Sequence, residues 1–349
     1  MNKPAARTIL DFTLISNPVG PSNKARHAIR KAVRSVDRLP QTSFLTHYLA
    51  MTEGIAEEEI LLGHGASHLL ALLTRAERVQ SILLPTPAPR VYEEMLKKAG
   101  VGIRPFMLDS SNGFKIDVEE FTERWRDVDA AMILNPHNPT GVGLPEELVA
   151  HLIQTAAEHD RLLILDETLR DFTGNPSPAK HVVAAPNAIM LRSFSTYHAL
   201  AGLRLGYAIG HQALLPRLRH LLEPWPVNSL APAAALASLR DKGYRKRTAQ
   251  FLSTETEYAR KKVGQLNGAA PIATPWGFLI RIQSSLAGLS DLLAQRGILV
   301  EHYSDAQDNH YLSFPFRSHA ENARFLRTLR WILRRQSQRE EGRSSATAD

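Results

Sequence analysis

The sequence contains no cysteine among its 349 residues, which excludes disulfide bonds, thiolate metal sites and cysteine nucleophiles. It has no apolar run approaching the roughly 18 residues that a membrane-spanning helix needs. Its first residues, MNKPAARTILDF, lack the long apolar core of a secretory signal. These absences predict a cytoplasmic protein with no membrane partner.

Negative charge is in short supply, because 35 acidic residues face 42 basic ones and the formal net charge is +7. The basic residues are scattered, as in RHAIRKAVR and DKGYRKRTAQ, on segments with helical periodicity. We interpret them as solvated helical faces and expect no nucleic-acid partner. The final stretch, RRQSQREEGRSSATAD, mixes both signs and then becomes small and polar, which is typical of a solvated tail.

Short apolar runs alternate with amphipathic segments between about residues 56 and 210, and several runs end in polar residues, as in RLLILDE and NAIMLRSF. Fully apolar strands that alternate with helices predict an α/β fold with a parallel sheet covered on both faces. From about residue 236 the pattern changes to that of a smaller α+β domain. We expect an N-terminal arm (1–35), a large domain (36–235), a small C-terminal domain (236–336) and a flexible tail (337–349).

Polar motifs follow the expected strands, where open α/β sheets bind their ligands. They are GHGASH (63–68), PTPAP (85–89), NPHNPTG (135–141), DET (166–168) and SFST (193–196). GHGASH places glycines at an expected helix start, where free N–H groups attract a phosphate, although a simple turn explains it equally. His64 and His68 need not share a helix face, and we expect no metal site there.

Three polar residues leave more than one interpretation open. Asp166 ends an apolar strand and needs a cationic or hydrogen-bonded partner, for which a structural salt bridge would suffice. Arg204 follows the serine-rich turn and could bind either a phosphate or a carboxylate. Thr196, within that turn, could be a nucleophile, a phosphate ligand or an ordinary turn residue.

Taken in order, these motifs resemble those of the fold-type I pyridoxal-phosphate (PLP) enzymes of the class I/II aminotransferase superfamily. Histidinol-phosphate aminotransferases and the threonine-phosphate decarboxylases of the cobalamin pathway are the most similar. The resemblance runs from ISNPVGP (15–21) to SHAENARFLRTL (318–329). It implies a large domain with a mainly parallel sheet, a small α+β domain, and a homodimer with the pocket at its interface.

The resemblance also implies roles for individual residues. Asn138 would bond the phenolic oxygen of the cofactor, and Asp166 would keep its pyridine nitrogen protonated. The residues that would hold the cofactor phosphate are Ala66, Ser67, Ser193, Ser195 and Arg204. Asn17 and Arg317 would bind the substrate, and Arg317 resembles the decarboxylase branch.

The sequence departs from the family at the position that matters most. Thr196 stands eight residues before Arg204, where the family has the lysine that forms an imine with the cofactor. A threonine hydroxyl cannot form an imine and is a poor base at neutral pH. Further departures stand where the family has the ring-stacking aromatic, two tyrosines and a substrate-binding arginine: Pro87, Leu169, Leu39 and Ser313.

These departures favour a repurposed or non-catalytic relative that binds a phosphorylated small molecule, or PLP or pyridoxamine phosphate (PMP) without a covalent bond. Such a chain would act as a homodimer or beside an active paralogue. The alternative is an active PLP-dependent aminotransferase or amino-acid-phosphate decarboxylase with a base other than lysine, for which His198 is the candidate.

Overall fold

The computed structural model describes residues 9–283 and 288–346. The chain divides into two compact units, of which the larger spans Gly20–Lys246. The smaller unit joins the described residues up to Val19 with those from Arg247 onward. Residues 9–19 therefore belong with the C-terminal part of the chain.

A seven-stranded sheet forms the centre of the larger unit, in the order β2-β8-β7-β6-β5-β3-β4. The strands from β7 to β4 are parallel, whereas β8 is antiparallel to both of its neighbours. The predicted mainly parallel α/β sheet is therefore confirmed. The strands are β2 (Ile60–Gly63), β3 (Ser81–Thr86), β4 (Gly102–Met107), β5 (Ala130–Leu134), β6 (Leu162–Asp166), β7 (Ala188–Ser193) and β8 (Gly206–Gly210).

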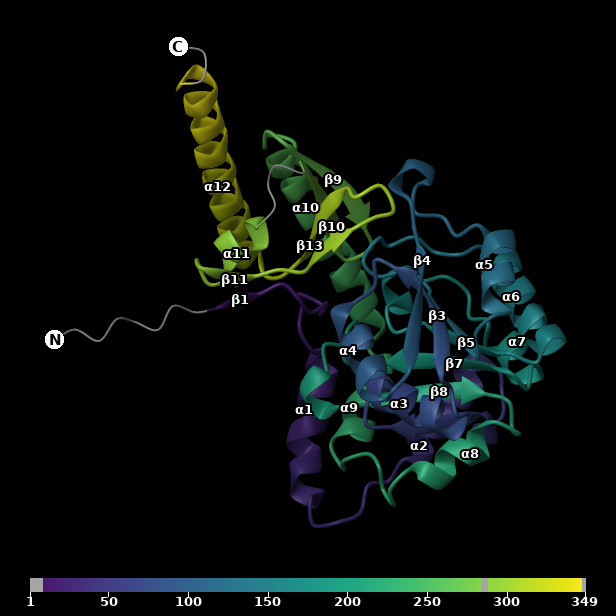
Figure 1. Ribbon diagram of the computed structural model, residues 1–349. Coiled ribbons are helices and arrows are strands. Elements are labelled where there is room, and N and C mark those ends of the chain that lie inside the picture. Colours follow the sequence, from purple (N-terminus) through teal and green to yellow (C-terminus); the bar gives the residue numbers. More distant parts are fainter. Residues whose placement is uncertain (1–8, 284–287, 347–349) are drawn as a thin grey trace. The chain divides into compact units, whose positions relative to one another are not determined.

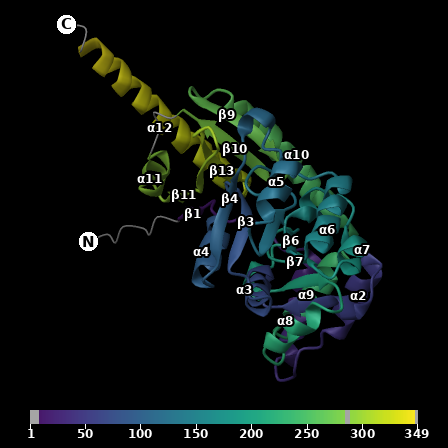
Figure 2. The same cartoon turned by 45° about the vertical axis from the view of Figure 1, so that its right-hand side comes forward.

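Helices lie on both faces of this sheet, which is why β5 and β6 are buried along their whole length (Figures 1 and 2). Apolar side chains of α3, α4 and α8 pack with those of the sheet in one core that includes Leu69, Leu96, Leu215 and Ile164. The helices of this unit are α1 (Asn23–Ala32), α2 (Ser43–Glu53), α3 (Ala66–Ala76), α4 (Arg90–Lys98), α5 (Val118–Trp125), α6 (Glu146–His159), α7 (Ala179–Ala184), α8 (Leu215–Leu221) and α9 (Ala231–Leu239), followed by the start of α10 (Lys242–Val263).

The smaller unit contains an antiparallel sheet of order β12-β13-β10-β9 and a parallel pair, β1 with β11. Phe314 and Phe325 stack in its core with ring centroids 4.3 Å apart, and Phe12 packs against both. Its elements are β1 (Leu10–Asp11), β9 (Ala269–Thr274), β10 (Gly277–Ile282), α11 (Leu289–Ala294), β11 (Ile298–Leu299), β12 (His302–Ser304), β13 (His310–Pro315) and α12 (His319–Ala346).

Helix α12 buries an apolar stripe formed by Phe325, Leu326, Leu329, Ile332 and Leu333. The segment expected to be a tail, 337–349, is helical as far as Ala346, since arginine, glutamate and glutamine favour helix. Its last residues lie outside the described part of the chain. Within the described residues, no helix is both long and apolar enough to cross a bilayer.

Candidate functional site

Strand ends at one edge of the large sheet bring the polar motifs together. The parallel strands β5, β6 and β7 are neighbours, and Asp166 at the end of β6 is in register with Leu134 of β5 and Leu191 of β7. Strand β2, two positions further along, runs in the same direction as β7 because each is antiparallel to β8. The turns that follow these strands therefore lie at the same edge of the sheet.

The start of α3 and Arg204 form a cationic corner at this edge. The Arg204 guanidinium lies 3.4 Å from the Ser67 hydroxyl, and a Cβ added to Gly65 would meet the same guanidinium at 2.8 Å. Gly65 caps α3 with a φ of +90°, and no side chain of the described residues caps the first N–H groups of that helix. N–H groups without a side-chain partner, the positive end of the helix dipole and a guanidinium are together suited to an anion.

Glycine at position 206 lets the first residue of β8 approach this corner. A Cβ on Gly206 would lie 2.5 Å from the Ala66 nitrogen and 2.8 Å from the Arg192 carbonyl oxygen. Both are backbone atoms that cannot rotate away, so any side chain here would push α3 and β8 apart.

The serine-rich turn after β7 is ordered by its own hydrogen bonds. The N–H of Ser195 donates to the Ser193 hydroxyl at 3.0 Å, and both side chains are half-buried. The Thr196 hydroxyl donates to the backbone carbonyl of Thr168 at 2.7 Å. Its proton is thus engaged by the chain itself, and the contact ties the turn after β7 to the turn after β6.

Asp166 is buried and held by two donors. The Tyr92 hydroxyl of α4 donates to its Oδ2, and the Thr168 N–H donates to its Oδ1 at 2.9 Å. Burial raises the pKa of Asp166 despite these hydrogen bonds, and burial together with the adjacent carboxyl raises the pKa of Tyr92 well above its usual value. The salt bridge to an arginine that sequence reasoning allowed for Asp166 is not found among the described residues.

Tyr92 is a partner of Asp166 that the sequence motifs did not predict, although its spacing on α4 is a signal for it. Tyr92, Met95 and Leu96 are spaced i, i+3 and i+4 on α4, and all three pack toward the core of the larger unit. A tyrosine on the inward stripe of a helix needs a polar partner for its hydroxyl, and the buried carboxylate of Asp166 supplies one.

The NPHNPTG turn after β5 is fixed around two side chains. The Asn135 amide oxygen accepts from the Leu144 N–H at 2.9 Å, and His137 Nδ1 lies 2.9 Å from the Thr140 hydroxyl. Burial lowers the pKa of His137 to about 4, so its ring is neutral at pH 7. Asn138 is half-buried, and its amide makes no hydrogen bond to another described residue. It is therefore available to a ligand.

His198, the candidate base, is buried with both ring nitrogens close to protein groups. Its Nδ1 lies 2.8 Å from the Ser238 hydroxyl, and its Nε2 lies 3.4 Å from the Asp171 carboxylate. The order Ser, His, Asp is that of a hydrolytic triad, but Ser238 is itself buried within α9. As the chain stands, no nitrogen of His198 is free for a ligand.

A buried ion-pair network surrounds Arg192 beside this histidine. Only 4% of the Arg192 side chain is exposed, and its guanidinium lies 3.2 Å from Glu167 and 3.4 Å from Glu53. Burial raises the pKa of Glu167 to about 7, because the attraction of Arg192 and Arg170 only partly offsets desolvation. These charged groups pair with one another within the larger unit, so we interpret the network as structural.

The expected substrate residues Asn17 and Arg317 belong to the smaller unit. The Asn17 amide donates to the Thr248 hydroxyl at 2.8 Å and accepts from the Val19 N–H. The Arg317 guanidinium donates to the backbone carbonyls of Asp11 at 2.7 Å and Leu14 at 2.8 Å. Both side chains thus already tie the N-terminal segment to its own unit.

The positions that depart from the resemblance have varied surroundings. Pro87 and Leu169 are buried in the larger unit, and Ser313 is buried on β13 of the smaller one. Leu39, by contrast, is 61% exposed. Among the described residues, no group of three or more histidine, cysteine, aspartate or glutamate side chains could hold a metal ion.

Comparison with known proteins identifies the family to which this chain belongs. The family model for aminotransferases of class I and II matches residues 43–308. The chain belongs to this family, whose members depend on PLP.

Among curated relatives, a histidinol-phosphate aminotransferase of Desulfotalea psychrophila is 29% identical over 325 residues, which cover 90% of this chain and 84% of the relative. A solved histidinol-phosphate aminotransferase of Sinorhizobium meliloti in complex with pyridoxal-5'-phosphate superposes with a TM-score of 0.83 at 21% identity, covering 95% of this chain and 92% of the other. An L-threonine-O-3-phosphate decarboxylase of Porphyromonas gingivalis gives a TM-score of 0.75 at 20% identity and covers 93% and 100%. These solved structures show that the fold is shared.

Proposed function

We propose that this chain is a relative of the class I/II aminotransferases that binds a phosphorylated small molecule without forming a covalent bond to it. The observation that carries the proposal is the hydroxyl of Thr196, which we assign to the position of the family's lysine. It already donates to the Thr168 carbonyl at 2.7 Å, and a hydroxyl forms no imine. Between His181 and Asp241 the sequence contains no lysine that could replace it.

The cationic corner at the start of α3 supports phosphate binding. Arg204 and Ser67 would hold phosphate oxygens, and the unsatisfied N–H groups of the first turn of α3 would donate to the others. The hydroxyls of Ser193 and Ser195, in the neighbouring turn, would complete the set. A phosphate ester is therefore the ligand chemistry that this corner fits.

The residues present fit non-covalent PLP or PMP better than the covalently bound cofactor. Asp166 is buried and has oxygen lone pairs left for a ring nitrogen, and the unpartnered Asn138 amide would reach a phenolic oxygen. In PLP enzymes the bound ring supplies an electron sink. We assign Thr196, Pro87 and Leu169 to the positions of the family's lysine, stacking aromatic and tyrosine. The chain therefore lacks the amine that would bond to the ring and two of the side chains that would hold the ring in place.

The alternative of an active aminotransferase or decarboxylase needs a base other than lysine. His198 would have to leave both Ser238 and Asp171 to serve, and it would lose the two side-chain contacts that hold its ring. Retention of Asp166 is the main feature in favour of this alternative. Because both ring nitrogens of His198 already contact protein groups, an active enzyme is the second candidate function.

We also propose a homodimer, because family members are generally dimeric and a patch of apolar side chains is exposed around Leu39. Val36, Leu39 and Phe44 lie between the end of α1 and the start of α2, and each is more than half exposed. An active paralogue could take the place of the second copy. Sedimentation of the purified chain tests this, and a monomer at micromolar concentration would contradict it.

Calorimetric titration with inorganic phosphate, PLP and PMP tests the binding site. The expected result is saturable binding that the Arg204→Gln variant weakens by about tenfold or more, as loss of a charge-assisted hydrogen bond predicts. Arg90→Gln is the matched control, because Arg90 is an exposed arginine paired only with Glu94 on α4. Equal affinities for the parent and Arg204→Gln would contradict the proposed site.

A further inference from the structure

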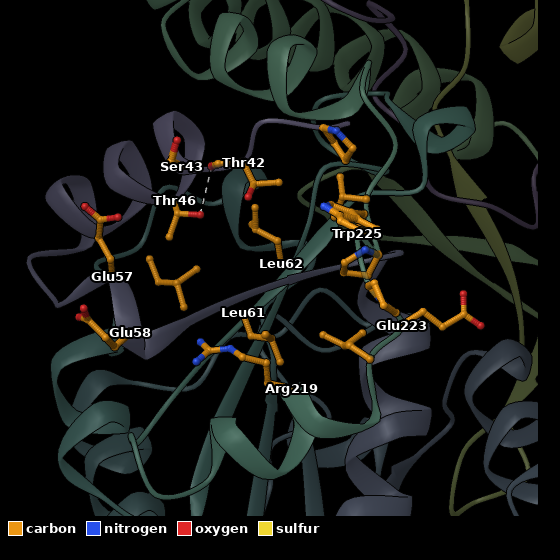
Figure 3. A pocket seen from close by; sticks show the side chains of 16 residues that line it. Thr42, Ser43, Thr46, Glu57, Glu58, Leu61, Leu62, Arg219, Glu223 and Trp225 are labelled. Atoms are coloured by element: carbon orange, nitrogen blue, oxygen red, sulfur yellow. Dashed lines mark hydrogen bonds between the residues drawn. The ribbon is translucent and has the colours of Figure 1, made fainter. Parts of the chain in front are cut away.

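A groove runs along the free edge of β2, which is the first strand of the seven-stranded sheet (Figure 3). Its volume is about 640 Å³, and its walls come from the start of α2, the turn Glu57–Glu59, the end of α8 and the loop 222–227. None of the residues assigned above to the phosphate site lines it. The groove is therefore a separate feature of the larger unit.

Strand β2 presents its hydrogen-bonding edge to this groove. The Ile60 N–H donates to the Glu57 carbonyl, so Ile60 faces away from β8. Residues of an antiparallel pair alternate in direction, so the N–H and C=O of Leu62 also point away from β8. In Figure 3 the side chains of Leu61 and Leu62 point to opposite sides of the strand, as expected where the edge faces the groove. No turn or loop of the described residues bonds to the Leu62 backbone.

Trp225 stands at the rim of the groove in a constrained conformation. It is 61% exposed, lies between Pro224 and Pro226, and has a φ of +53°. The left-handed region is costly for a large aromatic residue, so the loop holds this side chain outward at the expense of strain. An exposed tryptophan beside a groove is typical of an anchor for a binding partner.

The charge of the groove selects the kind of partner. Glu57 and Glu58 lie at one end, where Ile60 begins β2, and Glu223 lies near Trp225 (Figure 3). Arg219 is the one basic side chain among the described lining residues. The excess of carboxylates favours a cationic group, and the rows of leucine and proline side chains favour apolar ones.

We propose that the groove binds an extended segment of a partner protein, which adds to β2 as a further strand. The main chain of the segment would bond to Leu62, a basic side chain would face Glu57 and Glu58, and an apolar side chain would cover Trp225. A small organic cation would use the carboxylates but would leave the strand edge unsatisfied. An extended basic segment uses the edge, the charge and the tryptophan together, and it does not depend on the phosphate site.

The test uses a fluorescein-labelled peptide in which lysine, valine and threonine alternate, titrated into the full-length chain and followed by fluorescence anisotropy. Two further peptides carry N-methyl groups on alternate residues, so that either one edge or the other cannot donate hydrogen bonds. The expected result is saturable binding by the unmethylated peptide and by one of the two N-methylated peptides. The other N-methylated peptide should not bind. Replacing the lysines by glutamates should weaken binding at least tenfold.

Variants of the protein locate the site. Trp225→Ala should weaken binding about 30-fold, as the loss of an interface anchor predicts. Trp331→Ala is the matched control, because Trp331 is also exposed but lies on α12 of the smaller unit. Hydrogen exchange of the Leu62 amide should slow when the peptide is bound.

Several results would overturn the proposal. They are no saturable binding up to millimolar peptide, equal binding by both N-methylated isomers, or an affinity that Trp225→Ala leaves unchanged. A Trp225→Ala variant that converts a dimer to a monomer in sedimentation and binds no peptide would assign the groove to contacts between copies instead.

Discussion

The hydroxyl of Thr196 donates to the carbonyl oxygen of Thr168 at 2.7 Å and so joins the turn after β7 to the turn after β6. The same Thr168 donates its N–H to Asp166, so Thr196, Thr168 and Asp166 form one continuous chain of contacts. We propose that position 196 corresponds to the family's lysine, where covalent PLP chemistry would need an amine that reaches a ligand. Here its side chain stabilises the loops of the protein itself.

Replacing Tyr92 with phenylalanine removes the hydroxyl that donates to Asp166 Oδ2. A buried carboxylate that loses a donor is less well compensated, and we expect the free energy of unfolding at pH 7 to fall by about 1–3 kcal/mol. Urea unfolding measures this. Tyr48→Phe is the matched control, since its hydroxyl makes no hydrogen bond to another described residue, and it should change stability little. A Tyr92→Phe protein as stable as the parent would show that the contact is not needed to keep Asp166 buried.

Arg192→Met tests the buried ion-pair network. Glu53 and Glu167 would lose their shared cation inside the larger unit, and we expect a loss of about 3–5 kcal/mol in the free energy of unfolding. Arg90→Met, at an exposed pair with Glu94 on α4, should cost less than about 1 kcal/mol. Similar losses for the two variants would contradict the assignment of the Arg192 network as structural.

His137 predicts a dependence of stability on pH. Burial lowers its pKa in the folded chain to about 4 from an ordinary value of 6.5, so the folded state disfavours the charged ring. Its contribution is therefore fully present above pH 6.5 and is lost as the pH falls toward 4, by up to about 3 kcal/mol. In His137→Asn the decrease in stability between pH 7 and pH 4.5 should be smaller than in the parent. Parallel pH profiles for the two proteins would show that His137 is not titrating in this way.

Gly206→Ala tests the close approach of β8 to the start of α3. Its Cβ would lie 2.5 Å from the Ala66 nitrogen, so we expect a loss of about 1–3 kcal/mol in stability and weaker phosphate binding together. Gly202→Ala is the matched control, because an added Cβ there meets no atom within 4 Å. Thermal unfolding with and without phosphate separates the two effects, and an unaltered affinity in Gly206→Ala would place the anion elsewhere.

The sequence predicted the apolar strands and the mainly parallel sheet, for a physical reason. Parallel strands buried on both faces must be apolar throughout, so runs such as LLILD at β6 are visible without any structure. Because such strands end at one edge, the gathering of Asp166, Ser193 and Asn138 near that edge was predictable too.

Partners distant in the sequence were not predictable in the same way. Tyr92 and Asp166 are 74 residues apart, and their contact depends on how α4 packs on the sheet. The substrate role of Arg317 stays a prediction, whereas its hydrogen bonds to the carbonyls of Asp11 and Leu14 were not foreseen. An arginine carries the same donors in either role, so its contacts within the protein depend on how the N-terminal segment packs.

The most direct test of the account is whether the chain can bond covalently to PLP. The parent and a Thr196→Lys variant are each incubated with PLP, reduced with borohydride and examined by visible absorption and mass spectrometry. The account predicts no reduced adduct at the site in the parent, and an adduct on residue 196 in the variant. A stoichiometric adduct within the parent's site would contradict the account and would indicate an active PLP-dependent enzyme.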